Sequence, residues 1–310
     1  MEILTVESLK KIYGNKQFML DNINMQVERG SFVAILGDKM AGKTPLLQVI
    51  TGRKWADKGK VSFYGKDIRK MPLDSWKQIG WIPDDIMYYE NRTVKRIFER
   101  TISWTQRGTM ERAKELCRIF DIDMNQYILE LSDKQNRCVS FINTVFTNPE
   151  LICMDELYHH LDERTYLQML DLLGKLCERG TTVIASFDEY EKISGYCDNY
   201  ILLSEGDCVA QGSINKDYIP LKMVSMNLGT CFRETVSEGE LLEYVDMFVT
   251  ECRELADAQV IREGDKLLIP YNGDLTVLSH LFFKYGCEDY LIEKMTMEEH
   301  VQNNYTRWQE

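Results

Sequence analysis

Residues 37–44 read GDKMAGKT and satisfy the pattern G-x-x-x-x-G-K-[ST]. In such a loop, successive backbone N–H groups and the N-terminus of the following helix form a positive concavity that suits phosphate groups. We expect the Lys43 ammonium to reach the β- and γ-phosphates of a nucleotide and the Thr44 hydroxyl to bind Mg²⁺. The alternative is a surface turn that carries Gly and Lys by chance. The residues expected at the phosphates are Gly37, Asp38, Lys39, Met40, Ala41, Gly42, Lys43, Thr44 and Pro45.

A pair of acids far along the chain offers the complementary chemistry. Asp155 and Glu156 follow the short apolar run at residues 151–154. In phosphoryl transfer one acid orients Mg²⁺, and the next positions or deprotonates the attacking water. Two acids at the start of a helix would be the structural alternative. Together with the loop, the pair favours phosphoryl-transfer chemistry on a bound nucleotide, with Asp155 and Glu156 as the catalytic acids.

Two residues of the loop depart from an ideal phosphate site. Pro45 has no N–H to offer a phosphate, although proline is tolerated in the first turn of a helix. Met40 adds bulk where glycine would give a more compliant loop.

The elements that must position these residues follow from the apolar pattern. Continuous apolar runs at residues 32–36 and 151–154 predict buried parallel strands, and TVIAS at 182–186 predicts a third. Helical patterns run from residue 43 to 52 and from 162 to 179. Strands separated by helices predict βαβ units and a mainly parallel sheet. Residues 3–9, 20–27 and 61–64 predict an antiparallel or mixed subdomain instead.

The pattern changes near residue 216, which predicts two domains. Residues 1–215 would form the nucleotide-binding domain and residues 216–310 a small α+β accessory domain. Within the second, we expect helices over 241–255 and 275–285 and a hairpin over 259–270 that turns at residues 263–265.

Net charge, the length of apolar runs and the spacing of cysteines argue against several classes of protein. The 310 residues carry 37 Lys and Arg against 49 Asp and Glu, a net charge of −12, so no nucleic-acid partner is expected. No apolar run approaches the roughly 18 to 20 residues that cross a bilayer. The 9 cysteines are scattered, without CxxC spacing, and are expected to be reduced thiols of a cytosolic protein without structural zinc.

The order of further motifs over residues 1–215 resembles the ATP-binding subunit of an ABC transporter. These motifs are Tyr13, the segment IGWIP at 79–83, LSDKQ at 131–135, LD at 161–162 and ASFD at 185–188. The resemblance implies a P-loop NTPase cassette of the α/β class, with a mainly parallel core sheet, an antiparallel β subdomain and a helical subdomain. It also implies that Tyr13 stacks on adenine, that Ser132 faces a nucleotide, and that Thr44, Asp84 and Asp155 surround Mg²⁺.

Several positions depart from the family pattern. Asp84 stands at the position of the Q-loop glutamine and cannot donate a hydrogen bond as an amide does. Phe187 stands where the switch histidine is expected. Asp133 and Lys134 replace both glycines of the signature, and Lys134 is expected to offset part of the Asp133 charge. His159 and His160 are adjacent in a turn and are expected to point apart, as loop or interface residues.

The resemblance also implies partners. Two cassettes pair head to tail, identical or different, and a separate transmembrane subunit holds them at the inner face of the cell membrane. Residues 295–301 resemble the ending of small-exporter ATPases. We expect slow ATP hydrolysis. The alternatives are a nucleotide-binding regulatory or assembly subunit with little turnover, and a non-transport relative acting on ribosomes or DNA, which normally carries two cassettes.

Overall fold

The computed structural model describes most of the chain and divides it into two compact units, Met1–Lys216 and Asp217–Glu310. The described residues are 1–13, 18–37, 39–84, 91–187, 196–214, 222–228, 241–256, 260–271, 275–287 and 289–294. Asp38, residues 188–195 and the segment 295–301 therefore lie outside them. No helix in this part of the chain is long and apolar enough to span a bilayer.

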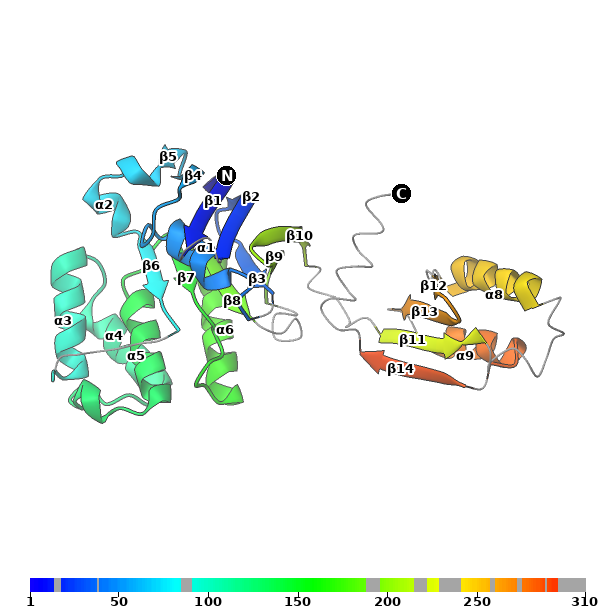
Figure 1. Ribbon diagram of the computed structural model, residues 1–310. Helices are drawn as coiled ribbons and strands as arrows, with labels where there is room; N and C mark the ends of the chain where they lie inside the picture. Colours follow the sequence, from blue (N-terminus) through cyan, green and yellow to red (C-terminus); the bar gives the residue numbers. More distant parts are fainter. Residues whose placement is uncertain are drawn as a thin grey trace. The chain divides into compact units, whose positions relative to one another are not determined.

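A six-stranded sheet organises the first unit, with the order β10-β9-β3-β8-β7-β6 (Figure 1). Its pairings are parallel except at the edge, where β10 runs antiparallel to β9. Its strands are β3 (Phe32–Leu36), β6 (Ile79–Ile82), β7 (Leu151–Met154), β8 (Thr182–Phe187), β9 (Asn199–Ser204) and β10 (Asp207–Ser213). All residues of β3, β7 and β8 are buried, as predicted for these three strands.

An antiparallel sheet forms the β subdomain, with the order β2-β1-β4-β5. Its strands are β1 (Glu2–Tyr13), β2 (Phe18–Glu28), β4 (Lys58–Phe63) and β5 (Lys66–Asp67). These bounds confirm the predicted antiparallel strands near the start of the chain.

Helices complete the first unit and gather in two places in Figure 1. The helices α1 (Lys43–Ile50) and α6 (Glu163–Glu178) lie beside the sheet, while α3 (Val94–Thr105), α4 (Met110–Ile119) and α5 (Asp133–Val145) form a helical subdomain. The short helix α2 (Leu73–Trp76) follows β5. The fold is thus the predicted α/β cassette with its β and helical subdomains.

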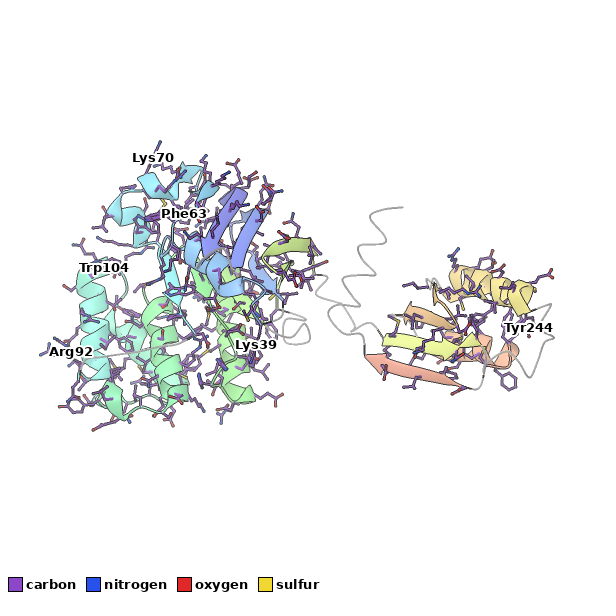
Figure 2. The ribbon with its side chains drawn as sticks, in the orientation of Figure 1. Lys39, Phe63, Lys70, Arg92, Trp104 and Tyr244 are labelled. Carbon is purple, nitrogen blue, oxygen red and sulfur yellow. The ribbon has the colours of Figure 1, made fainter. Side chains whose placement is uncertain are left out.

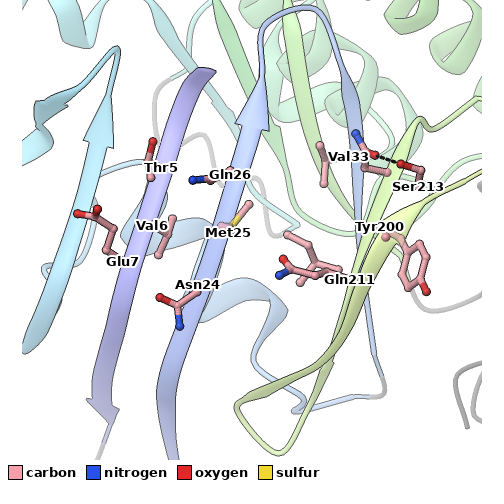
Figure 3. Close-up of a pocket in the computed structure, with 13 residues that line it drawn as sticks. Thr5, Val6, Glu7, Asn24, Met25, Gln26, Val33, Tyr200, Gln211 and Ser213 are labelled. Carbon is pink, nitrogen blue, oxygen red and sulfur yellow. Dashed lines mark hydrogen bonds between the residues drawn. The ribbon is translucent and has the colours of Figure 1, made fainter. Parts of the chain in front are cut away.

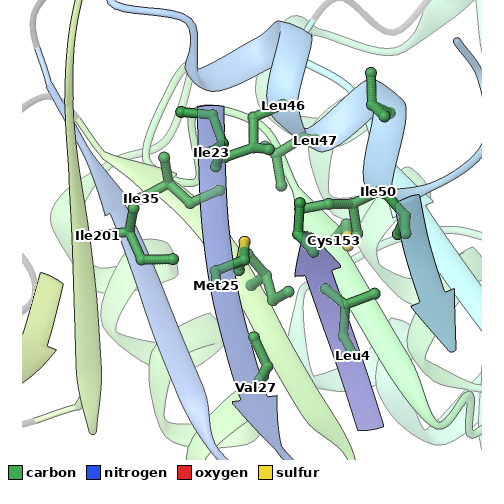
Figure 4. Close-up of a cluster of buried hydrophobic side chains, with 14 of the residues drawn as sticks. Leu4, Ile23, Met25, Val27, Ile35, Leu46, Leu47, Ile50, Cys153 and Ile201 are labelled. Carbon is green, nitrogen blue, oxygen red and sulfur yellow. The ribbon is translucent and has the colours of Figure 1, made fainter. Parts of the chain in front are cut away.

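The core that supports the phosphate loop joins both sheets to α1 (Figure 4). Leu46, Leu47 and Ile50 of α1 are fully buried in one cluster with Ile35 of β3 and Cys153 of β7. Each such side chain stabilises the fold by about 1.5–3 kcal/mol when removed from water. The loop between β3 and α1 is therefore held at both ends by packed, rigid elements.

The second unit is a four-stranded antiparallel sheet with the order β12-β13-β11-β14. Its elements are β11 (Lys222–Asn227), α8 (Leu241–Ala256), β12 (Ile261–Glu263), β13 (Lys266–Tyr271), α9 (Leu275–Lys284) and β14 (Tyr290–Lys294). This βαββαβ order is that of a ferredoxin-like fold. Its core includes Phe248 of α8, Phe282 of α9 and Val224 of β11, which confirms the predicted small α+β unit.

Candidate nucleotide site

The phosphate loop leaves β3 through a glycine that the packing requires. Gly37 has φ +144°, and a Cβ there would lie 2.3 Å from the Leu203 carbonyl oxygen and 2.8 Å from the Ala41 Cβ. Gly42 caps α1 with φ 112°, again in the left-handed region that favours glycine. Met40, which lies between the two glycines, also has a left-handed backbone, with φ 70°.

The remaining loop residues are placed unequally. Met40 is 86% exposed, and Lys39 is exposed at the surface of the unit (Figure 2), whereas Ala41 and Lys43 are buried. Pro45 is the third residue of α1. The first helical bond runs from the Leu46 N–H to the Gly42 carbonyl, so the missing N–H of Pro45 costs the helix no bond.

Lys43 connects the loop to the second acid. Its Nζ donates to the Gly37 carbonyl oxygen at 2.6 Å and lies 3.5 Å from Oε1 of Glu156, although the side chain is only 5% exposed. Because β3 and β7 both flank β8 in a parallel sheet, their carboxyl ends meet at one edge. The sheet therefore brings the predicted lysine and the predicted acid together across about 110 residues of sequence.

Asp155 is more deeply buried than Glu156, with 2% of its surface exposed. Burial raises its pKa, while hydrogen bonds from the Thr44 and Ser186 side chains oppose the rise. The Ser186 hydroxyl donates to Asp155 Oδ1 at 2.8 Å and accepts from the Glu156 N–H at 2.7 Å. Ser186 thus orients both acids, a role that the sequence analysis missed although the residue precedes Phe187 in a motif that it quoted.

These residues fit a magnesium nucleotide. The Asp155 carboxylate and the Thr44 hydroxyl are hydrogen-bonded to each other, so two hard oxygen ligands of the kind that Mg²⁺ takes lie together beside the lysine. The loop supplies the left-handed turn and helix N-terminus that suit phosphates.

Asp84 is engaged by a histidine. His159 Nδ1 lies 2.6 Å from Asp84 Oδ1, and the His159 ring stacks on His160 at 4.5 Å between centroids. The expectation that the two histidines point apart was wrong, because their rings stack; the His160 backbone is left-handed, with φ 61°. Nothing in the residue types alone indicated the Asp84 contact.

The signature position forms its own local bonds. Ser132 caps α5 in a capping box with Gln135, whose N–H donates to Ser132 Oγ at 3.3 Å. Lys134 pairs with Asp162 at the start of α6 rather than offsetting Asp133 as expected. That pairing lowers the pKa of Asp162. Tyr13 ends β1, and its side chain lies outside the described part of the chain.

Phe187 is directed away from the acids. It is fully buried and its ring lies 6.4 Å from that of Phe32. The preceding residue, Ser186, bonds to Asp155, and successive side chains of a strand point to opposite faces of the sheet, so Phe187 lies on the other face. The side chain is a core residue here.

Phe187→His should therefore not raise ATP hydrolysis. Because the ring position is apolar, we expect the imidazole to lower the free energy of unfolding by about 2–4 kcal/mol. Urea unfolding and steady-state ATPase assays measure the two effects, with Phe187→Leu as the apolar control. A faster ATPase in the histidine variant would contradict this placement.

A polar pocket of 430 Å³ lies elsewhere on the first unit, between β1 and β2 on one side and β9 and β10 on the other (Figure 3). Its lining includes Asn24, Gln26 and Gln211 but no residue of the phosphate loop or the acid pair. The candidate nucleotide site is therefore defined by the Lys43 cluster and not by this pocket.

Comparison with known proteins assigns the first unit. Residues 20–158, which include the loop and both acids, match the family model described as ABC transporter. An uncharacterized ABC transporter ATP-binding protein of Methanocaldococcus jannaschii is 29% identical over 68% of this chain and 78% of its own length. These matches support an ABC transporter ATP-binding subunit, with the family model covering residues 20–158.

Other relatives of this ABC cassette differ in their named roles. The ribose import ATP-binding protein RbsA of Caldanaerobacter subterraneus subsp. tengcongensis is 26% identical over 85% of this chain, which spans only 56% of that protein. The lipopolysaccharide export system ATP-binding protein LptB of Haemophilus influenzae is 26% identical over 69% of this chain and 91% of its length. The names thus cover both import and export.

Solved structures agree with the fold of the ABC cassette. The ATP-binding subunit of an ABC transporter superposes with a TM-score of 0.63 at 22% identity, over 68% of this chain and 90% of that one. A dimeric ATP-binding cassette in a post-hydrolysis state with ADP and Pi gives 0.60 at 21% identity, over 69% and 99%.

Proposed function

We propose that this chain binds ATP with Mg²⁺ and energises a transport system as its cytoplasmic ATP-binding subunit. The observation that supports this most is the Lys43 cluster, in which the ammonium lies 3.5 Å from Glu156 and 2.6 Å from the loop carbonyl of Gly37. A phosphate tail bound by the loop would lie within reach of the same ammonium.

Each residue of the site takes a definite role in this proposal. The loop residues 37–45 hold the phosphates, Thr44, Asp84 and Asp155 hold the cation, and Tyr13 stacks on adenine. Bound Mg²⁺ would neutralise phosphate charge. Glu156 positions or deprotonates the attacking water, since Ser186 fixes its backbone and Lys43 its carboxylate. Ser132 serves the nucleotide of a second, head-to-tail cassette.

The cassettes would act on a separate transmembrane subunit at the inner face of the cell membrane. We assign the system to export because of the sequence of residues 295–301, which lie outside the described residues. Hydrolysis would be slow, since Asp133 adds a carboxylate at the signature and Phe187 offers no donor at the carboxyl edge of the sheet.

A second candidate is a regulatory or assembly subunit that binds ATP with little turnover. Two observations favour it: the Phe187 ring is packed against Phe32, and Asp84 is engaged by His159. In this candidate, position 187 offers no polar side chain for catalysis and the Asp84 carboxylate is occupied by His159, whereas the phosphate loop is retained. The two candidates share nucleotide binding and differ in turnover.

The transport assignment is tested by co-expression with a membrane protein and a second cassette whose genes neighbour the gene of this chain. We expect a detergent-stable complex whose cassettes associate more tightly in ATP and Mg²⁺, measured by light scattering of the purified complex. Lys43→Ala should abolish the nucleotide effect. A chain that binds ATP and yet joins neither protein would contradict the assignment.

A further inference from the structure

Arg137 is a buried guanidinium one turn into α5, and the proposed chemistry does not use it. Only 1% of its surface is exposed, and among the described residues it is the largest side chain that is fully buried. Burial lowers the pKa of the guanidinium, against the attraction of Asp84, Asp155 and Glu156. A buried charge of this kind destabilises a fold unless its hydrogen bonds are well satisfied.

The bonds of Arg137 divide between two loops. Nη1 donates to the carbonyl oxygen of Pro83 and lies 3.5 Å from that of Asp84. Nη2 donates to the carbonyl oxygens of Asp155 and Glu156, the latter at 2.7 Å. Each terminal nitrogen therefore serves one loop, and the rigid plane of the guanidinium sets the separation between the two.

The two loops are the continuations of neighbouring parallel strands. Ile82 at the end of β6 faces Met154 at the end of β7, and the Asp155 N–H donates to the Ile82 carbonyl at 2.9 Å. Beyond these residues the strand ladder ends. Just after the last paired residues, the hydrogen bonds of Arg137 connect the two chains. There Asp84 follows β6, and Asp155 and Glu156 follow β7.

We propose that Arg137 is a positioning residue that fixes the Asp84 loop against the Asp155–Glu156 loop, so that cation ligands from both loops are arranged before nucleotide binds. The role of the cation rests on the proposed function, whereas the tie between the loops does not. Lysine cannot replace this residue, because a single ammonium lacks two separated nitrogens that could each face one loop. Since Arg137 belongs to α5, the tie also joins the acids to the helix that begins at the signature position.

Hydrogen exchange of the nucleotide-free full chain tests the tie directly. In Arg137→Lys and Arg137→Met, we expect the Asp155 and Glu156 amides, which donate to Ile82 and to Ser186, to exchange at least about tenfold faster. The amides of α6 should keep their rates. Arg118→Lys and Arg118→Met, at an exposed position of α4, serve as matched controls. Unchanged exchange at both acids, or equal acceleration throughout the cassette, would overturn the proposal.

Nucleotide affinity separates this inference from the proposed function. ATP binding without magnesium should be unchanged in Arg137→Lys, while the gain in affinity on adding Mg²⁺ should fall about 10- to 100-fold, as for other residues that orient metal ligands. An unaltered magnesium effect in Arg137→Lys would count against positioning of the cation ligands. Absence of ATP binding in the unsubstituted chain would refute the proposed function and leave the exchange test intact.

Discussion

Lys43→Ala is expected to abolish measurable ATP binding. The ammonium is 5% exposed, is held by the Gly37 carbonyl and lies 3.5 Å from Glu156, so the substitution removes the positive charge that the loop places beside the acid. A charge-assisted hydrogen bond contributes about 1.5–3 kcal/mol, and the substitution also removes the ion pair between Lys43 and Glu156. We expect a loss in affinity of about 100-fold or more, measured by isothermal titration calorimetry with ATP and Mg²⁺.

Lys70→Ala is the matched control for this experiment. Lys70 is an exposed lysine of the β subdomain (Figure 2), so its removal subtracts the same charge without touching the loop. Thermal unfolding of both variants checks that the fold survives. Unchanged ATP affinity in Lys43→Ala would refute the assignment of residues 37–45 as the phosphate loop.

The parts of the fold that the sequence predicted well are those set by continuous local patterns. The strands β3 and β7 have the predicted bounds, and β8 extends one residue beyond its predicted end at residue 186. Short, mainly apolar runs of this kind are typical of strands that are buried on both faces of a parallel sheet. The proximity of Lys43 to Glu156 was also predictable, because the carboxyl ends of parallel strands lie at the same edge of a sheet. The pattern of the chain therefore anticipated the site in outline.

The contacts that residue types alone could not predict depend on where single side chains turn. Phe187 packs near Phe32 of the neighbouring strand β3, a contact that depends on the pairing of β3 with β8. Asp84 meets His159 across 75 residues, and Lys134 meets Asp162 across 28, through loop conformations that no periodicity encodes. Arg137 precedes a stretch that reads as ordinary helical core, so its charge alone was the available signal.

Glu156→Gln is expected to slow ATP hydrolysis by about 10²- to 10⁴-fold while ATP binding persists, because an amide retains the shape of the side chain but cannot accept a proton from water. The substitution also removes the attraction between the Glu156 carboxylate and the Lys43 ammonium, so affinity for ATP should hold or rise. Asp155 remains buried and hydrogen-bonded to Ser186, which preserves the cation ligand. Single-turnover hydrolysis and equilibrium binding on the same preparation measure both quantities.

The same substitution decides between the two proposed functions. Glu178→Gln, at the exposed end of α6, removes an equal charge far along the chain from the acids and should leave both quantities unaltered. If the unsubstituted complex turns over ATP and Glu156→Gln stops it, the energising subunit is supported, because the activity then depends on the acid beside Lys43. If the unsubstituted complex binds ATP without turnover, the arrangement of Phe187 and Asp84 prevents hydrolysis even though Glu156 is present. That result would support the regulatory or assembly subunit, because a subunit that binds ATP without hydrolysing it can respond to nucleotide but gains no energy from hydrolysis.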